Sequence, residues 1–120
     1  MSESINYVEF PASNIEATKA FFKSCFSWEF EDYGPECCAF SNAGLEGGFY
    51  KSEKSSTTDS GAALVVLLSE DILVSLEKVK SCGGEIVQEI FEFPGGCRFH
   101  FKEPSGNELA VWSTTVPKTY

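Results

Sequence analysis

The same order of predicted elements occurs twice along the chain, and this repeat limits the possible folds more than any other feature. In each half, an alternating strand pattern is followed by a helical pattern and then by three short strand patterns. The tripeptide Lys-Ser-Cys ends both helical patterns, at 23–25 and at 80–82, and the two copies are 57 residues apart. At the same offset Ile15 corresponds to Ile72. We therefore interpret the sequence as an internal duplication of a βαβββ unit.

The first half begins with an alternating strand pattern over residues 5–10. Ser13 and Glu16 are three residues apart, the spacing of a capping box, and predict the start of a helix. Apolar spacing predicts the buried face of this helix, and turn residues separate three strands after it. The predicted buried face consists of Ile15, Thr18, Phe22 and Cys25, and the strands lie at 28–31, 37–40 and 45–50.

The second half follows a polar stretch, residues 51–61, that is rich in Ser, Thr and Lys and is typical of a linker. An apolar run over 62–68 predicts its first strand. The helix face and the remaining strands repeat the order of the first half. The predicted helix face consists of Ile72, Leu76 and Val79, and the strands lie at 86–90, 98–102 and 108–112.

Two such units predict an α+β fold. We expect two tandem βαβββ modules that form one curved eight-stranded mixed sheet, with the helices on the outside and a concave cleft inside. A length of 120 residues is typical of one domain, so we assign residues 1–120 to a single domain. Its parts are a first module at about 5–50, the linker at 51–61 and a second module at about 62–113.

Composition excludes several classes of partner. The net charge is −9, and because nucleic acids and anionic membranes require a positive surface, we expect neither as a partner. No basic leader and no apolar run of membrane length occurs. The five cysteines are an odd number without metal-type pairing, which favours reduced thiols and a cytoplasmic location.

A hairpin near the C-terminus has a distinctive turn. Residues 98–102 and 108–112 alternate as strands around Glu103-Pro104-Ser105-Gly106-Asn107. This pattern resembles the closing strands of the vicinal-oxygen-chelate superfamily (glyoxalase I, bleomycin-resistance proteins and extradiol dioxygenases). In that superfamily an acidic residue, Pro, any residue, Gly and Asn precede the last strand. The resemblance extends over the whole chain, from 5–9 through 13–17 to the hairpin.

The resemblance implies four metal-ligand positions, which metal-dependent members fill with His, Gln or Glu. Here these positions hold Tyr7, Gly48, Leu64 and Ala110. Tyr is a poor ligand at neutral pH and the other three have no side-chain donor, so we expect no metal and no other cofactor.

A relocated metal site is an alternative. Glu9, Glu46 and Glu108 each lie two residues from one of the four positions and on the same face, near His100. However, two residues along a strand displace a side chain by roughly 7 Å. Ligand geometry is strict, so this displacement argues against a relocated site.

Strand alternation predicts which side chains line the cleft. It gives an apolar floor, aromatic rings and a few ionisable groups, the composition of a small-molecule pocket. The predicted lining consists of Tyr7, Glu9, Glu46, Tyr50, Leu64, Val66, Leu68, Arg98, His100, Glu108 and Trp112.

Glu9 lies in an otherwise apolar strand, where an unpaired carboxylate would be costly. It is therefore either a general base or ligand-binding acid, or the partner of Arg98 in a structural ion pair. Tyr7 or His100 would donate a hydrogen bond to a developing oxyanion. A single His on a strand is more often hydrogen-bonded packing, and we favour that interpretation of His100. Tyr50 and Trp112 would stack on a planar ligand or fill the cleft themselves.

These observations predict a metal-independent protein of the glyoxalase/bleomycin-resistance group that binds a small organic molecule. The resemblance implies a homodimer and, for an enzyme, a lyase- or isomerase-type reaction. The alternatives are a non-catalytic protein for sequestration or sensing and a divalent-metal lyase or dioxygenase.

Overall fold

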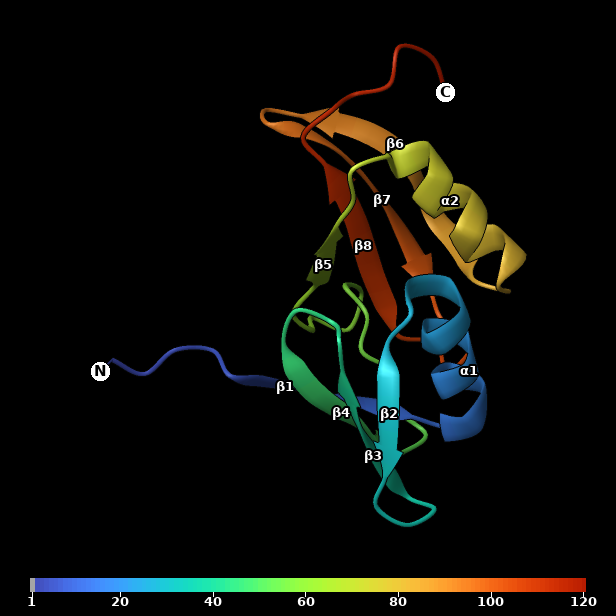
Figure 1. Cartoon of the computed structure of the whole chain (residues 1–120). Helices are drawn as coiled ribbons and strands as arrows, with labels where there is room; N and C mark the ends of the chain where they lie inside the picture. Colours follow the sequence, from blue (N-terminus) through green and yellow to red (C-terminus); the bar gives the residue numbers. More distant parts are fainter. Residues whose placement is uncertain (1) are drawn as a thin grey trace.

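The computed structural model describes residues 2–120, which form two helices and eight strands in two four-stranded sheets. The first sheet has the strand order β1-β4-β3-β2 and the second the order β5-β8-β7-β6. Both helices lie on the same side of the molecule (Figure 1). The elements are β1 (Tyr7–Ala12), α1 (Ile15–Phe26), β2 (Glu29–Asp32), β3 (Cys37–Ser41), β4 (Glu46–Lys51), β5 (Val65–Leu68), α2 (Ile72–Ser81), β6 (Glu85–Phe93), β7 (Gly96–Lys102) and β8 (Glu108–Ser113).

This order confirms the α+β fold class and the two tandem βαβββ modules. In both sheets the first strand of the module pairs in parallel with the fourth, and the other pairs are antiparallel. The strands form two separate sheets rather than the one continuous sheet that we expected. One reason is that β1 is an edge strand containing Pro11, which has no N–H to donate to a further strand.

Helix α1 begins one residue later than the predicted capping box. Asn14, not Ser13, is the N-cap, and its side-chain oxygen accepts a hydrogen bond from the N–H of Ala17 at 3.0 Å. The helix ends at Phe26, and its C-cap residue Ser27 adopts a left-handed conformation with φ of 62°. The predicted inward face is confirmed, because Ile15, Thr18, Phe22 and Cys25 are all buried.

Aromatic rings connect the modules on the side of the helices. From α1, Phe21 and Phe26 lie 5.8 Å and 6.0 Å from Phe101 of β7, measured between ring centroids. Phe22 of the same helix stacks on Trp28 at 4.3 Å. These residues belong to one hydrophobic cluster that includes side chains from both modules. Helix α1 therefore packs against the second module as well as its own.

The turn between β7 and β8 provides a polar connection between the modules. Asn107 is fully buried; its side-chain amide donates to the carbonyl of Pro11 at 2.7 Å and accepts from the N–H of Ser56 at 2.8 Å. Gly106, with φ of 87°, supplies the positive φ that the turn requires. The Asn107 side chain therefore joins β1, the linker and β8.

Two other residues of this turn are buried against the first module. The Ser105 hydroxyl lies 2.6 Å from the Thr18 hydroxyl and accepts from the N–H of Asn14 at 3.1 Å. Burial raises the pKa of Glu103, and hydrogen bonds from the N–H of Ser105 and the amide of Asn107 only partly offset this. We call the aromatic cluster and this turn together the helix-side junction.

The inner face of each sheet is defined here as the side turned away from the helices. Alternation places Phe10 and Ala12 of β1 in the core, so Tyr7 and Glu9 lie on the inner face. The same argument applies to the second sheet, where Phe99, Phe101, Leu109 and Val111 are buried towards α2. Its inner face carries Val66, Leu68, Arg98, His100, Glu108 and Trp112.

Neither helix in residues 2–120 is long and apolar enough to cross a membrane.

Replacing Asn107 tests the helix-side junction. Asn107→Ala leaves the buried carbonyl of Pro11 and the half-buried N–H of Ser56 without partners, so we expect a loss of about 2–4 kcal/mol in the free energy of unfolding. The measurement is urea denaturation followed by circular dichroism. Asn6→Ala, at an exposed position, is the control and should change stability by less than about 0.5 kcal/mol. A junction variant as stable as the control would contradict this role.

Candidate functional site

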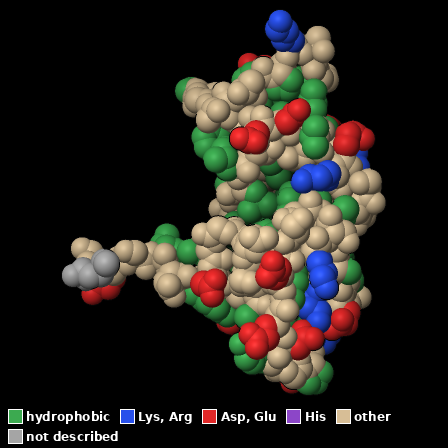
Figure 2. Space-filling model, in the orientation of Figure 1, with side chains coloured by type: hydrophobic (Ala, Val, Ile, Leu, Met, Phe, Trp, Pro, Cys, Tyr) green, Lys and Arg blue, Asp and Glu red, His purple; other side chains and the backbone are tan. Residues whose placement is uncertain are grey.

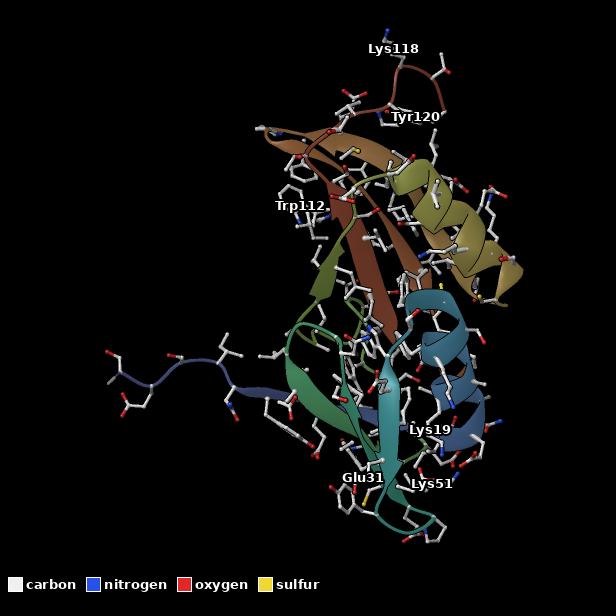
Figure 3. The ribbon with its side chains drawn as sticks, in the orientation of Figure 1. Lys19, Glu31, Lys51, Trp112, Lys118 and Tyr120 are labelled. Carbon is white, nitrogen blue, oxygen red and sulfur yellow. The ribbon has the colours of Figure 1, made fainter. Side chains whose placement is uncertain are left out.

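The predicted cleft residues are divided between the inner faces of two sheets. Tyr7, Glu9, Glu46 and Tyr50 lie on the first sheet, and all four are exposed. The second sheet carries the rest, and its side chains form a denser arrangement. Figure 3 shows Trp112 projecting from β8 on the side away from α2. In Figure 2, hydrophobic side chains gather on that side of the upper half of the molecule.

On the first sheet, Glu9 forms a hydrogen bond within its own strand. The hydroxyl of Tyr7 donates to the Glu9 carboxylate at 2.9 Å, and this bond raises the pKa of Tyr7. Glu9 is exposed, so the desolvation cost that singled it out in the sequence does not arise in this chain. Its expected ion pair with Arg98 is also absent from residues 2–120.

On the second sheet, His100 and Glu108 form a buried pair. They are 8% and 7% exposed, and Nδ1 of His100 lies 2.8 Å from Oε2 of Glu108. The other carboxylate oxygen, Oε1, accepts from both the N–H and the hydroxyl of Thr58 at 2.9 Å. Burial alone would raise the pKa of Glu108, but the hydrogen bonds from His100 and Thr58 outweigh it and lower the pKa.

The ionised carboxylate of Glu108 determines which ring nitrogen of His100 carries the hydrogen. A carboxylate only accepts hydrogen bonds, so Nδ1 of His100 carries the hydrogen, and in the neutral ring Nε2 keeps its lone pair. Nε2 is buried and has no hydrogen-bond partner. The pair therefore presents Nε2 as a proton acceptor, and the hydrogen bond from Nδ1 to Glu108 fixes the orientation of the ring. The same arrangement is found around catalytic and metal-binding histidines.

Arg98 lies two residues before His100 on β7, on the same inner face. Its strand neighbours are Phe91 of β6 and Trp112 of β8. The guanidinium carbon is 5.2 Å from the centre of the Phe91 ring and 5.7 Å from that of Phe93, both at cation–π distance. The ring centroids of Phe93 and Trp112 are 6.2 Å apart. Aromatic rings thus support the guanidinium, and Arg98 as a whole is half-buried.

Sequence reasoning missed Thr58, Phe91 and Phe93. Thr58 lies in a stretch read as a linker without pattern, and no local signal connects it to Glu108. The two phenylalanines lie beyond the predicted end of the sixth strand at 90, whereas β6 continues to Phe93. The spacing of the two phenylalanines, two residues apart, is the pattern in the sequence that could have extended the predicted strand beyond residue 90.

The metal positions implied by the family do not fit a cation in this structure. A Cβ at Gly48 would lie 2.5 Å from the carbonyl oxygen of Cys38 and 2.9 Å from the hydroxyl of Tyr7, so no ligand side chain has room there. Leu64 and Ala110 have no side-chain donor. In residues 2–120 no three His, Cys, Asp or Glu side chains come together as a metal site.

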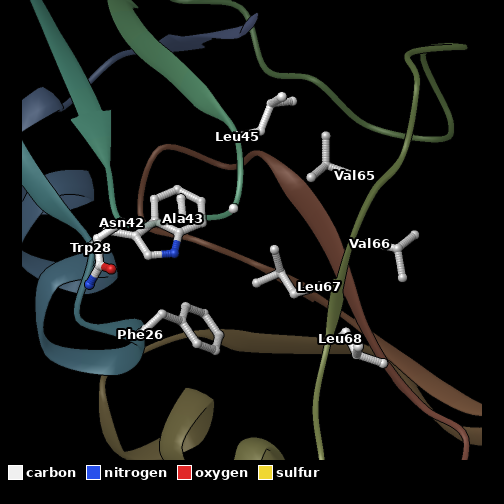
Figure 4. Close-up of a pocket in the computed structure, with 10 residues that line it drawn as sticks. Phe26, Trp28, Asn42, Ala43, Leu45, Val65, Val66, Leu67 and Leu68 are labelled. Atoms are coloured by element: carbon white, nitrogen blue, oxygen red, sulfur yellow. The ribbon is translucent and has the colours of Figure 1, made fainter. Parts of the chain in front are cut away.

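A crevice of about 540 Å³ lies between the modules. In Figure 4, Val65 and Leu67 of β5 point towards Phe26 and Ala43, whereas Val66 points away. Its walls are mainly apolar, and it contains none of the predicted catalytic residues. It is therefore separate from the His100–Glu108 pair.

Comparison with known proteins identifies the class that this fold and site define. A family model described as "Glyoxalase/Bleomycin resistance protein/Dioxygenase superfamily" matches residues 4–111. The chain therefore belongs to this superfamily, as the resemblance in the sequence predicted. No curated protein shows a significant sequence match to the chain.

Solved structures show the same fold at low identity. A genomically encoded fosfomycin resistance protein from Listeria monocytogenes has a TM-score of 0.78 and 17% identity, with 96% of each chain covered. A glyoxalase-related enzyme from Fulvimarina pelagi has a TM-score of 0.76 and 13% identity, covering 93% of this chain and 88% of the other. Lactoylglutathione lyase from Agrobacterium tumefaciens has a TM-score of 0.71 and 16% identity, covering 93% and 94%.

The role of Glu108 can be tested through its pH dependence. Because the folded-state pKa is lowered, the stabilisation by Glu108 is present above the unfolded-state pKa and is lost as the pH falls through the folded value. We expect Glu108→Gln to lower the free energy of unfolding by about 1–3 kcal/mol at pH 7, and by less below about pH 4.

The measurement is urea denaturation at several pH values. Glu29→Gln, at an exposed position on β2, is the control and should have little effect at any pH. An equal loss for Glu108→Gln at neutral and acid pH would contradict the role of the ionised carboxylate.

Proposed function

We propose that this protein binds a small organic molecule at the inner face of its second sheet, without a divalent ion at the family's metal positions. The observation that supports this most directly is the arrangement around Arg98 and His100. A cation and a buried proton acceptor lie among aromatic rings on one face, the composition of a ligand site. The lower part of this face is a crevice of about 270 Å³ that His100, Glu108 and Thr58 line.

We further propose that a second copy of the chain completes the cleft. Several large hydrophobic side chains on or beside the inner faces are exposed, and their exposure is costly for a lone chain. They are Ile5 (83%), Tyr7 (49%), Tyr50 (40%), Val66 (39%) and Leu68 (69%). A homodimer in which the first sheet of one copy faces the second sheet of the other would cover both sets. Glu9 would then lie opposite the Arg98–His100 face of the partner.

A lyase- or isomerase-type reaction is a second candidate, supported by the pair formed by Tyr7 and Glu9. The carboxylate would act as general base and a hydroxyl as hydrogen-bond donor to a developing oxyanion. The alternative is binding alone, for sequestration or sensing. The five cysteines are all free thiols, which supports a location in the reducing cytoplasm for either role.

The oligomeric state tests the proposed cleft. Wild-type protein should sediment as a dimer of the 13.2 kDa chain in analytical ultracentrifugation. Leu68→Lys places a charge on the exposed inner edge without disturbing the core, and we expect it to yield monomers. Val74→Lys, at a similarly exposed site on α2 (55%), is the matched control and should remain dimeric. A monomeric wild-type protein would contradict the proposal.

Glu9→Gln separates catalysis from binding. For a compound that the wild-type protein converts, we expect kcat to fall by about 10²-fold or more, because proton transfer by a positioned base contributes at least that much. Glu29→Gln, at an exposed position of β2 outside the predicted cleft lining, is the control and should retain activity. If Glu9→Gln changes only the affinity, or leaves kcat unchanged, Glu9 is not the base.

A further inference from the structure

Two buried polar atoms lack a hydrogen-bond partner, and they lie close together. Among the side chains of residues 2–120, only Nε of Arg98 and Nε2 of His100 are buried without a partner. Both belong to β7 and point to its inner face, two residues apart. Such groups are rare in folded proteins because each carries an uncompensated desolvation cost, which a bound ligand would remove.

Arg98 is the only arginine in a chain with 18 Asp and Glu residues, yet no carboxylate pairs with it. The carboxylate contacts of basic side chains in residues 2–120 involve Lys19, Lys51 and Lys80 or, as a hydrogen bond, the His100 ring. The guanidinium carbon lies over the rings of Phe91 and Phe93, so its N–H groups are the donors that remain for a ligand. A guanidinium edge matches the geometry of carboxylate and phosphorus oxyanions.

Nε2 of His100 is a hydrogen-bond acceptor and thus complements the N–H donors of Arg98. Glu108 holds the hydrogen on Nδ1, so Nε2 of the neutral ring accepts a hydrogen bond and does not donate one. Phe91 lies beside both groups, with its ring 5.9 Å from the His100 ring and 5.2 Å from the Arg98 guanidinium. The spacing of the two side chains along the strand is roughly 7 Å, close to the length of one substituted aromatic ring.

We propose that the ligand is a small planar anion that spans the distance from Arg98 to His100 on the inner face. Its carboxylate or phosphorus oxyanion binds the edge of Arg98, its ring stacks beside Phe91 and Trp112, and an O–H or N–H at its other end donates to Nε2 of His100. This inference rests on the proposed small-molecule function and specifies its substrate class.

The chain offers unambiguous reporters for a test, because it contains one arginine and one histidine. The probe is 4-hydroxybenzoate, which carries a carboxylate and a hydroxyl at opposite ends of one ring. Nuclear magnetic resonance of ¹⁵N-labelled protein records the Arg98 Nε–H signal, the His100 ring nitrogens and the Trp112 indole during titration. We expect all three to shift together, and the His100 nitrogens should show the Nδ1–H tautomer.

Three further measurements assign the contacts. Benzoate, which lacks the hydroxyl, should bind at least threefold more weakly and leave the His100 nitrogens unshifted. Arg98→Met keeps a long side chain against the rings but removes the donors, and should weaken binding of 4-hydroxybenzoate at least tenfold. Lys80→Met removes a charge from the outer surface of α2 and should leave the affinity unchanged.

The neutral probe 4-hydroxybenzamide separates this inference from the proposed function. If the amide binds the inner face as tightly as the acid, or if Arg98→Met binds the acid like wild type, the anion site is wrong while ligand binding at the face stands. If neither probe shifts the Arg98, His100 or Trp112 signals, the planar-anion inference is overturned, and the proposed function is then judged by the oligomeric state and the Glu9 variant.

Discussion

The helix-side junction is the constraint on which the rest of the structure depends. Asn107 bonds to Pro11 and Ser56 at once, and the rings of Phe21 and Phe26 pack on Phe101. These contacts fix the two modules to each other on the side of the helices. Because the connection is buried and includes polar groups whose partners cannot be replaced by water, the modules cannot separate without a substantial cost.

One consequence is that the inner faces remain open. With both helices on the same side (Figure 1), the two sheets present their other faces next to each other rather than across a closed cavity. Groups that a cleft would bring together are divided between them, Tyr7 and Glu9 on one sheet and Arg98 and His100 on the other. This division is the reason for proposing a second copy of the chain as part of the site.

The second sheet also shows how the family's scaffold has changed its polar groups in this chain. The resemblance implies a metal-ligand position at Ala110, and here the nearest acid is Glu108, two residues earlier. Its carboxylate is already engaged by His100 and Thr58. The acid therefore orients an imidazole, and the other polar groups of the face are the proton acceptor of that imidazole and a guanidinium.

Much of this fold could be predicted from the sequence, because the repeat, the helical faces and the hairpin turn are local patterns. Alternation also placed Arg98, His100 and Trp112 on one face. The predictions that failed depended on distant contacts. Asn107 lies in the predicted turn, but no local pattern indicates that its side chain joins three segments. The Glu9 carboxylate is exposed because its strand lies at an open edge.

Thr58 illustrates the limit most clearly, since nothing near it in the sequence indicates that it caps the carboxylate of Glu108. Local patterns report the periodicity of an element but not the tertiary contacts of a loop. The same limit applies to Arg98, because its position over the rings of Phe91 and Phe93 depends on the register between β6 and β7.

A crystal structure of the protein grown with Mn²⁺ or Zn²⁺ present tests the central claim most directly. The account predicts a dimer whose cavity has Tyr7 and Glu9 of one copy on one wall and Arg98 and His100 of the other copy on the opposite wall, with no cation at Tyr7, Gly48, Leu64 or Ala110. Inner faces that remain in solvent, or a divalent ion held at those four positions, would contradict it.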